Sequence, residues 1–194
     1  MHDINARIAQ RVRGLRAERE LSLDALASRC EVSRSMLSLI ERGESSPTAV
    51  VLEKIATGLG VSLASLFDDA STSIDPVSRA AQRTRWRDPQ SGYWRCNISP
   101  PNYPSPIQIV EVEMPAGAQV AYETGARETD VHQQIWVREG RIDVTVGRDR
   151  HELAEGDCLA MQLDRPIAFH NRGRRIARYV VVLASDRLRP AANR

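Results

Sequence analysis

The stretch Leu21–Gly43, which reads LSLDALASRCEVSRSMLSLIERG, decides the fold of the first part of the chain. Ser22 and Ser33 are candidate N-caps, because a serine hydroxyl at that position accepts a backbone N–H two or three residues further on. Apolar residues recur at helical spacing after each serine, and Gly43 suits the position just beyond a helix end. The stretch predicts two short helices, one from Ser22 to about Cys30 and one from Ser33 to Gly43.

The second of these helices has an outer face suited to a DNA groove. Placed at about 100° per residue, three apolar residues form the stripe expected to face the core, namely Met36, Leu37 and Ile40. The opposite side carries side chains that can bond to base edges or phosphates, or pack on a thymine methyl group; these are Arg34, Ser35, Ser38, Leu39 and Arg42. A face that is merely solvated would usually carry more Glu and Lys. We therefore expect this face to bind DNA, with a generic helical bundle as the alternative.

The region from about Ile4 to Phe67 resembles the Cro/repressor-like (XRE-type) helix-turn-helix domain. The matching motif residues are Leu21-Ser22, Leu26-Ala27, Val32-Ser33 and Ile40-Glu41-Arg42-Gly43. The resemblance implies a lambda-repressor-like domain of five helices. The three other helices that the residues support span 5–19, 48–59 and a short segment capped by Ser62 that ends at Leu66 and Phe67.

The same resemblance assigns roles to individual residues. It implies that the groove is contacted by Ser22, Leu23, Arg34, Ser35, Ser38 and Leu39, with Arg42 near the DNA backbone. It also implies an ion pair between Arg16 and Glu41. Glu31 departs from the pattern, because the family usually has glycine in this turn. If the backbone there has positive φ, a residue other than glycine costs about 1 kcal/mol or more, which affects stability rather than function.

The charge of this region supports DNA binding only locally. Residues 1–70 carry nine basic and ten acidic side chains, a net charge of −1. Phosphate contact depends on local fields, and five arginines lie close together in the first predicted helix, at positions 7, 11, 13, 16 and 19. For Arg7 and Arg11, a solvated face with pairs four residues apart is an equal alternative.

Composition points to an ordinary cytoplasmic protein. The 194 residues are 42% hydrophobic, so a buried core needs no covalent staples. The three cysteines form no CxxC pair, which indicates neither a disulfide framework nor a zinc module. No segment reaches the roughly 18 apolar residues of a membrane helix, and the N-terminus has no hydrophobic signal region. We expect a soluble protein in the cytoplasm with no membrane partner.

The pattern changes after Phe67, and three regions follow. Residues 1–68 form the helix-turn-helix domain, 69–90 a polar and turn-rich linker, and 91–194 a β domain. In the β domain the apolar period is two, and strands are expected at 107–114, 131–137, 142–146, 158–163 and 176–183, with turns between them. An antiparallel sandwich or barrel follows.

Residues 105–185 resemble the cupin superfamily, a jelly-roll β-barrel. The matching segments are Pro115-Ala116-Gly117, Trp136 to Val144, Leu153 to Asp157 and Pro166 to Asn171. The expected fold is therefore a multidomain α + β protein. Cupins often bind a metal through three histidines and a glutamate, and the corresponding positions here are near Arg127, Thr129, Gln133 and Ile167. None of these is a ligand of the required type, and His132 and His170 lie one residue away, so we expect no metal and no cofactor.

The barrel interior offers a place for a small effector. Its plausible inward residues are Gln133, Ile135, Met161, Ile167 and Phe169, of which we take Gln133, Met161, Ile167 and Phe169 as the effector-binding candidates. Gln133 is the first choice, because an inward-facing amide needs a polar partner. The alternative is that these side chains only fill the core.

Three function classes remain. The first is a transcriptional regulator, not an enzyme, that binds an operator in double-stranded DNA as a homodimer, with the cupin domain dimerising or sensing an effector. The second is a metal-dependent oxidoreductase resembling the phosphonate epoxidase, whose iron chemistry needs ligands that this sequence lacks. The third is an antitoxin or restriction controller, which usually has only the helical domain. We favour the regulator.

Overall fold

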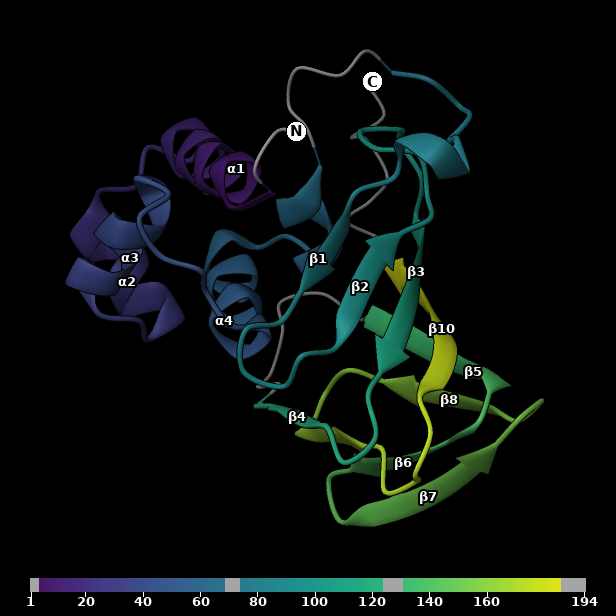
Figure 1. The fold of residues 1–194 in the computed structure, drawn as a ribbon. Helices are drawn as coiled ribbons and strands as arrows, with labels where there is room; N and C mark the ends of the chain where they lie inside the picture. Colours follow the sequence, from purple (N-terminus) through teal and green to yellow (C-terminus); the bar gives the residue numbers. More distant parts are fainter. Residues whose placement is uncertain (1–3, 69–73, 124–130, 186–194) are drawn as a thin grey trace.

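The computed structural model describes residues 4–68, 74–123 and 131–185, and places the helices first and the strands after them (Figure 1). The helical elements are α1 Ile4–Glu18, α2 Leu23–Cys30, α3 Arg34–Glu41, α4 Ala49–Leu59 and the 3-10 helices η1 Leu63–Phe67 and η2 Ala80–Gln82. The bounds of α1 to α4 lie close to those expected from the caps and the apolar period, whereas η2 lies in the range 69–90 that the sequence assigned to a linker. No helix among the described residues is long and apolar enough to cross a membrane.

The expected fifth helix is not an α-helix. The segment capped by Ser62 is η1, a 3-10 helix of five residues, and Asp68 directly after it is already extended. The cap itself forms as expected, since Ser62 Oγ accepts the N–H of Ser65 at 3.2 Å. Five residues between a cap and a polar, turn-rich segment are too few to build the successive turns that stabilise an α-helix.

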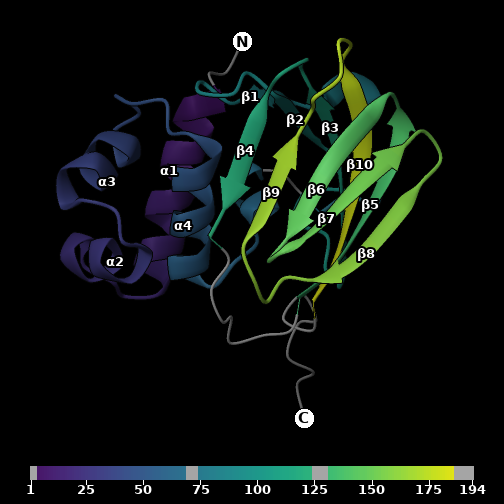
Figure 2. The ribbon, with the colours of Figure 1, turned by 90° about the horizontal axis from the view of Figure 1, so that it is seen from below.

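The β domain consists of two antiparallel sheets that face each other (Figure 2). One sheet has the strand order β1-β2-β3-β10-β5-β8, and the other has the order β4-β9-β6-β7. The strands are β1 Arg85–Arg87, β2 Trp94–Asn97, β3 Ile107–Met114, β4 Gln119–Tyr122, β5 Val131–Glu139, β6 Arg141–Val146, β7 Asp149–Ala154, β8 Cys158–Gln162, β9 Ile167–His170 and β10 Ala177–Ser185. This arrangement is the cupin-like double sheet expected from the sequence.

The sequence missed five of these strands. Four of them, β1, β2, β4 and β9, have only three or four residues, which is too short for a sustained alternation. The fifth, β7, reads DRHELA and is mostly polar. Strand β1 lies inside the range 69–90 that the sequence assigned to a linker, and it pairs with β2 at the edge of the larger sheet.

The helices and the sheets share one continuous core. Trp86 of β1 packs between Phe67 of η1 and Tyr93, with ring centroids 5.4 and 6.0 Å away. Asn97 of β2 donates its amide N–H to the carbonyl of Ala64 in η1 at 2.8 Å. Helix α4 lies beside β4 in Figure 2. The end of the helical domain is therefore held against the opening of the β domain.

Candidate DNA-binding surface and barrel cavity

Helices α2 and α3, formed by the stretch Leu21–Gly43, begin at the serine N-caps predicted from the sequence. Ser22 Oγ accepts the N–H of Ala25 at 3.1 Å, and Ser33 Oγ accepts the N–H of Met36 at 3.2 Å. The turn between α2 and α3 passes through Glu31 with φ 51° and ψ 39°, so the position where the family usually has glycine does require a left-handed backbone. Gly43 follows α3 with φ 71°.

Helix α3 buries a different stripe from the one expected. Leu37 and Ile40 are buried as predicted, but Met36 is 38% exposed and the prediction that it belongs to the core is wrong. Glu41 is buried in its place. Leu37, Ile40 and Glu41 lie within about 100° of one another around the helix axis. Met36 lies outside this stripe, on the side of Ile40.

Glu41 is buried because Arg16 of α1 neutralises it. The guanidinium makes a two-pronged bond, from Nε to Oε1 at 2.7 Å and from Nη2 to Oε2 at 2.9 Å. The hydrogen bond to Glu41 raises the pKa of Arg16 above its ordinary value. This is the ion pair implied by the family resemblance, and it fixes the orientation of α3 against α1.

The outer face of α3 presents the residues expected to meet DNA. Arg34, Ser35 and Arg42 are exposed, whereas Ser38 and Leu39 are half-buried, so Leu39 is less exposed than the sequence suggested. On α2 and its cap, Ser22 is exposed and Leu23 is half-buried against the core.

Both arginines on this face have acidic neighbours in the free protein. Arg34 Nε lies 2.9 Å from Asp24 Oδ1, and Arg42 Nη2 lies 2.8 Å from Glu44 Oε2. Arg42 also donates to the hydroxyl of Ser38. All four charged side chains are about half exposed or more, and such surface pairs contribute little free energy. DNA phosphates could replace the carboxylates at small cost.

Arg7 and Arg11 have a structural role instead. Arg7 Nη2 donates to the carbonyl of Phe67 at 2.8 Å, and its Nη1 donates to Thr84 Oγ1 at 2.5 Å. Arg11 Nε donates to the carbonyl of Ser65 at 3.2 Å. These bonds hold α1 against η1, so the two side chains do not form a simple solvated face.

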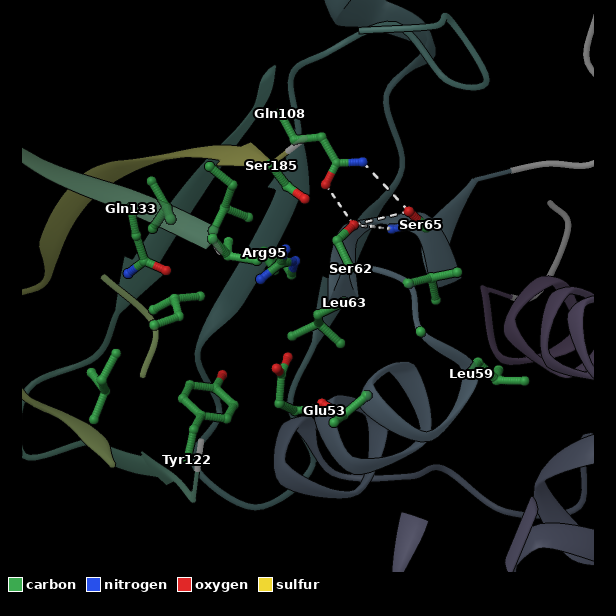
Figure 3. Close-up of a pocket in the computed structure, with 18 of the residues that line it drawn as sticks. Glu53, Leu59, Ser62, Leu63, Ser65, Arg95, Gln108, Tyr122, Gln133 and Ser185 are labelled. Carbon is green, nitrogen blue, oxygen red and sulfur yellow. Dashed lines mark hydrogen bonds between the residues drawn. The ribbon is translucent and has the colours of Figure 1, made fainter. Parts of the chain in front are cut away.

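A cavity of about 870 Å³ opens between the β domain and the end of the helical domain (Figure 3). Gln133, Ile167 and Phe169, three of the four effector-binding candidates, line it. Met161 does not; it is half-buried on β8 and packs against the core. Ile135, the other inward candidate, is fully buried and also lies outside the lining.

The walls of the cavity are rich in aromatic side chains. Tyr179 stacks on Phe169 with 5.8 Å between ring centroids and 2° between planes, and Tyr122 meets Phe169 edge-on at 6.2 Å. The hydroxyls of Tyr93 and Tyr122 lie 3.0 Å apart. Burial raises the pKa of all three tyrosines, so they are neutral phenols able to donate hydrogen bonds.

The helical domain supplies the other wall. Ser62 Oγ donates to Gln108 Oε1 at 2.5 Å, and Gln108 Nε2 donates to Ser65 Oγ at 3.4 Å, which joins η1 to β3 at the cavity (Figure 3). Glu53 of α4 also lines it. None of these residues was predicted to lie at the cavity, because the sequence placed the effector site inside the barrel alone.

Arg95 is the functional candidate that the sequence missed most clearly. It lines the cavity and is only 8% exposed. It stands on β2 opposite Val112 of β3, and both side chains point to the inner face. The sequence could have indicated its position only if residues 94–97 had been recognised as a strand that pairs with the alternating run 107–114. Four residues alone do not predict a strand.

The cupin metal positions do not suit a metal here. Gln133 and Ile167 occupy two of them, and neither side chain is a normal transition-metal ligand. Arg127 and Thr129 lie outside the described residues. Of the neighbouring histidines, His132 is exposed and His170 half-buried. Within 4–68, 74–123 and 131–185, no three His, Cys, Asp or Glu side chains gather in a way that could hold a metal ion.

Comparison with known proteins identifies the class. Residues 12–66 match the helix-turn-helix family HTH_3. The chain is 30% identical over 177 residues to the HTH-type transcriptional regulator SutR of Escherichia coli (strain K12), covering 89% of this chain and 92% of SutR. The crystal structure of an HTH_3 family transcriptional regulator from Vibrio cholerae matches with TM-score 0.75 and 31% identity, covering 93% of this chain and 96% of that one.

A third relative matches the helical domain alone. The control protein C.MunI of Mycoplasma sp is 39% identical over 70 residues, which are 36% of this chain and 95% of the control protein. SutR and the Vibrio cholerae regulator, by contrast, match through the β domain as well. Fold and surface thus define a helix-turn-helix transcriptional regulator with a cupin-like β domain. The chain belongs to the XRE-type HTH_3 family. This assignment favours the regulator over the phosphonate epoxidase.

Proposed function

We propose that this protein regulates transcription by binding an operator in double-stranded DNA through the outer face of α3. The observation that carries the proposal is the surface formed by exposed Arg34, Ser35 and Arg42 together with half-buried Ser38. The helix that presents this surface is held from its other side by the Arg16–Glu41 pair. The hydroxyls and guanidinium groups can bond to base edges and phosphates, and Leu39 can pack on a thymine methyl group. Ser22 and Leu23 at the start of α2 complete the contact surface.

A homodimer would make this binding specific. One recognition helix reads only a few base pairs, whereas two helices about 34 Å apart read successive turns of one DNA face. The net charge of −1 over residues 1–70 also argues for two DNA-binding domains per operator. A domain without excess positive charge gains little from non-specific attraction to DNA. We propose that the β domain provides this pairing and binds a small effector in its cavity.

The DNA contact is tested by a double variant, Arg34→Ala with Ser38→Ala, in binding assays with DNA from the protein's own promoter region at about 150 mM salt. We expect the affinity to fall tenfold or more, because each lost base or phosphate bond weakens binding. The matched control is Arg165→Ala, which also removes an exposed arginine paired with an aspartate, but on the β domain. Equal binding by the double variant and the wild type would show that α3 does not enter the groove.

Dimerisation is tested separately by the mass of the full chain in solution and by the number of chains bound per operator. We expect two chains per operator. A single chain bound with full affinity contradicts the dimer without affecting the assignment of α3.

A further inference from the structure

Arg95 places a positive charge inside the cavity between the two domains. Its guanidinium lies between Gln133 of β5 and Ser62 at the start of η1, with Tyr122 below it (Figure 3). The residue is 8% exposed, so the charge is largely removed from water. A buried charge of this kind normally has a hydrogen-bonded partner.

One edge of this guanidinium has no such partner. Nε and Nη2 are both buried and make no hydrogen bond to any described residue. The N–H groups of Nε and Nη2 point in the same direction and form the edge that matches the two oxygens of a carboxylate. The unsatisfied atoms are therefore the pair that a carboxylate would occupy, and not a random selection of the five N–H groups.

Arg95 also makes a cation–π contact with an aromatic ring. The guanidinium carbon lies over the Phe67 ring, 5.5 Å from its centre, which is a cation–π contact. Such a contact stabilises the charge but does not satisfy the N–H groups along its edge.

The charges around the cavity favour an occupant with a single negative charge. Glu53 contributes a carboxylate to the lining, and Arg19 and Arg29 lie on its helical side. Arg29 is exposed and Arg19 about one-third exposed, so Arg95 is the buried cation of the cavity within the described residues. A single carboxylate matches this one buried cation, whereas a doubly charged anion such as phosphate would leave one of its charges without a buried cation to balance it.

The rest of the lining favours an apolar body on the same molecule. Tyr122, Phe169 and Tyr179 form an aromatic wall, and aliphatic side chains such as Val120 and Leu183 lie beside them. A cavity of about 870 Å³ is large enough for a small organic molecule.

We propose that Arg95 binds the carboxylate of a small organic acid whose apolar or aromatic body fills the cavity. This inference rests on the proposed effector role of the β domain and names the chemical class of the effector. The acid contacts η1 and the end of α4 as well as the sheets, so it bridges the DNA-binding and β domains.

The test uses the full chain and three probes, phenylacetate, indole-3-acetate and octanoate, each compared with its neutral primary amide and with inorganic phosphate. Binding is measured by calorimetry and by the shift in Tm. We expect at least one acid to bind and raise Tm, while its amide and phosphate do not. We expect Arg95→Met to weaken binding of that acid tenfold or more, and Arg95→Lys to weaken it less. Arg29→Met, which removes an exposed arginine from the same cavity, serves as the matched control and should leave binding within about twofold.

A second measurement separates recognition from folding. Without ligand, Arg95→Met should melt at or above the wild-type Tm, because the substitution removes a buried charge with unsatisfied N–H groups. A large fall in Tm would assign Arg95 a structural role and overturn the proposal. Binding of none of the three acids, or of phosphate alone, would overturn it too.

The outcomes also separate this inference from the proposed function. If acids and amides bind equally well, the cavity still holds an effector but Arg95 does not recognise a carboxylate. If an acid binds through Arg95 without changing the affinity for promoter DNA, the inference stands and the effector role fails.

Discussion

Asp88 accepts a hydrogen bond from the backbone N–H of Ala49, with 2.8 Å between Oδ1 and the nitrogen. Ala49 is the first residue of α4, and Asp88 follows β1, so a carboxylate from the β side caps a helix of the DNA-binding domain. Its other oxygen, Oδ2, accepts from both the backbone N–H and the hydroxyl of Ser91. A negative charge at a helix N-terminus also interacts favourably with the helix dipole. The opposite end of α4, at Leu59, lines the cavity.

Replacing Asp88 should therefore weaken the contact between the two parts of the chain. Asp88 is 2% exposed, and Asp88→Ala leaves buried N–H groups without partners, so we expect the free energy of unfolding in urea to fall by roughly 3 kcal/mol. The matched control is Asp75→Ala, an exposed aspartate that accepts one backbone N–H from Val77. A loss no greater than that of the control would show that the cap contributes little.

Two helix caps, Ser22–Ala25 and Asp88–Ala49, differ in how far apart the bonded residues lie in the sequence. This separation decides which cap the sequence could predict. The caps at Ser22 and Ser33 involve atoms three residues apart, so the local sequence contains the whole signal. The family's usual glycine singled out Glu31 as the position to check for positive φ, and the backbone there has φ 51°. The cap on α4 joins residues 39 apart, and only the folded chain brings them together.

The cavity could be predicted only in part for the same reason. Gln133, Ile167 and Phe169 were found because they alternate along strands or follow the cupin pattern, and they do line it. Arg95 was missed because its inward orientation depends on the pairing of β2 with β3. Met161 was expected to contribute, but the lining depends on how η1 and α4 close the cavity, which no strand pattern contains.

Two glycines inside helices should respond in opposite ways to alanine. A Cβ on Gly14 of α1 meets nothing within 4 Å, whereas a Cβ on Gly58 of α4 would lie 2.9 Å from the Cβ of Cys30 in α2. Neither has positive φ, so helix propensity alone would favour alanine at both by about 0.5–1 kcal/mol. We expect Gly14→Ala to stabilise by that amount.

Gly58→Ala should instead destabilise by roughly 1–3 kcal/mol, because α2 and α4 must move apart. The free energy of unfolding in urea measures both effects, and each variant serves as the control for the other. Stabilisation by both substitutions would mean that Cys30 can shift without cost and that the close approach of α2 and α4 is not required.

Asp68, directly after η1, should make stability depend on pH in an unusual direction. Burial raises the pKa of its carboxyl to about 6, although Arg11 and Arg7 oppose the shift. In the unfolded chain the group titrates near its ordinary value of about 3.9. Between these values the folded state holds the proton more tightly, so the ionised carboxylate destabilises the fold, fully above pH 6 and not at all below pH 4.

Asp68→Asn removes that cost. We expect the variant to exceed the wild type in free energy of unfolding by roughly 2 kcal/mol at pH 8, and the difference to shrink as the pH falls from about 6 to about 4. Urea unfolding at several pH values measures it. Asp164→Asn is the control, and its effect should have the opposite sign. The hydrogen bond from Arg165 lowers the pKa of Asp164, so the ionised carboxylate stabilises the fold. This substitution should therefore lower the free energy of unfolding at pH 8 but not at low pH. A difference between Asp68→Asn and the wild type that does not change with pH would show that Asp68 is ionised as easily in the fold as in water.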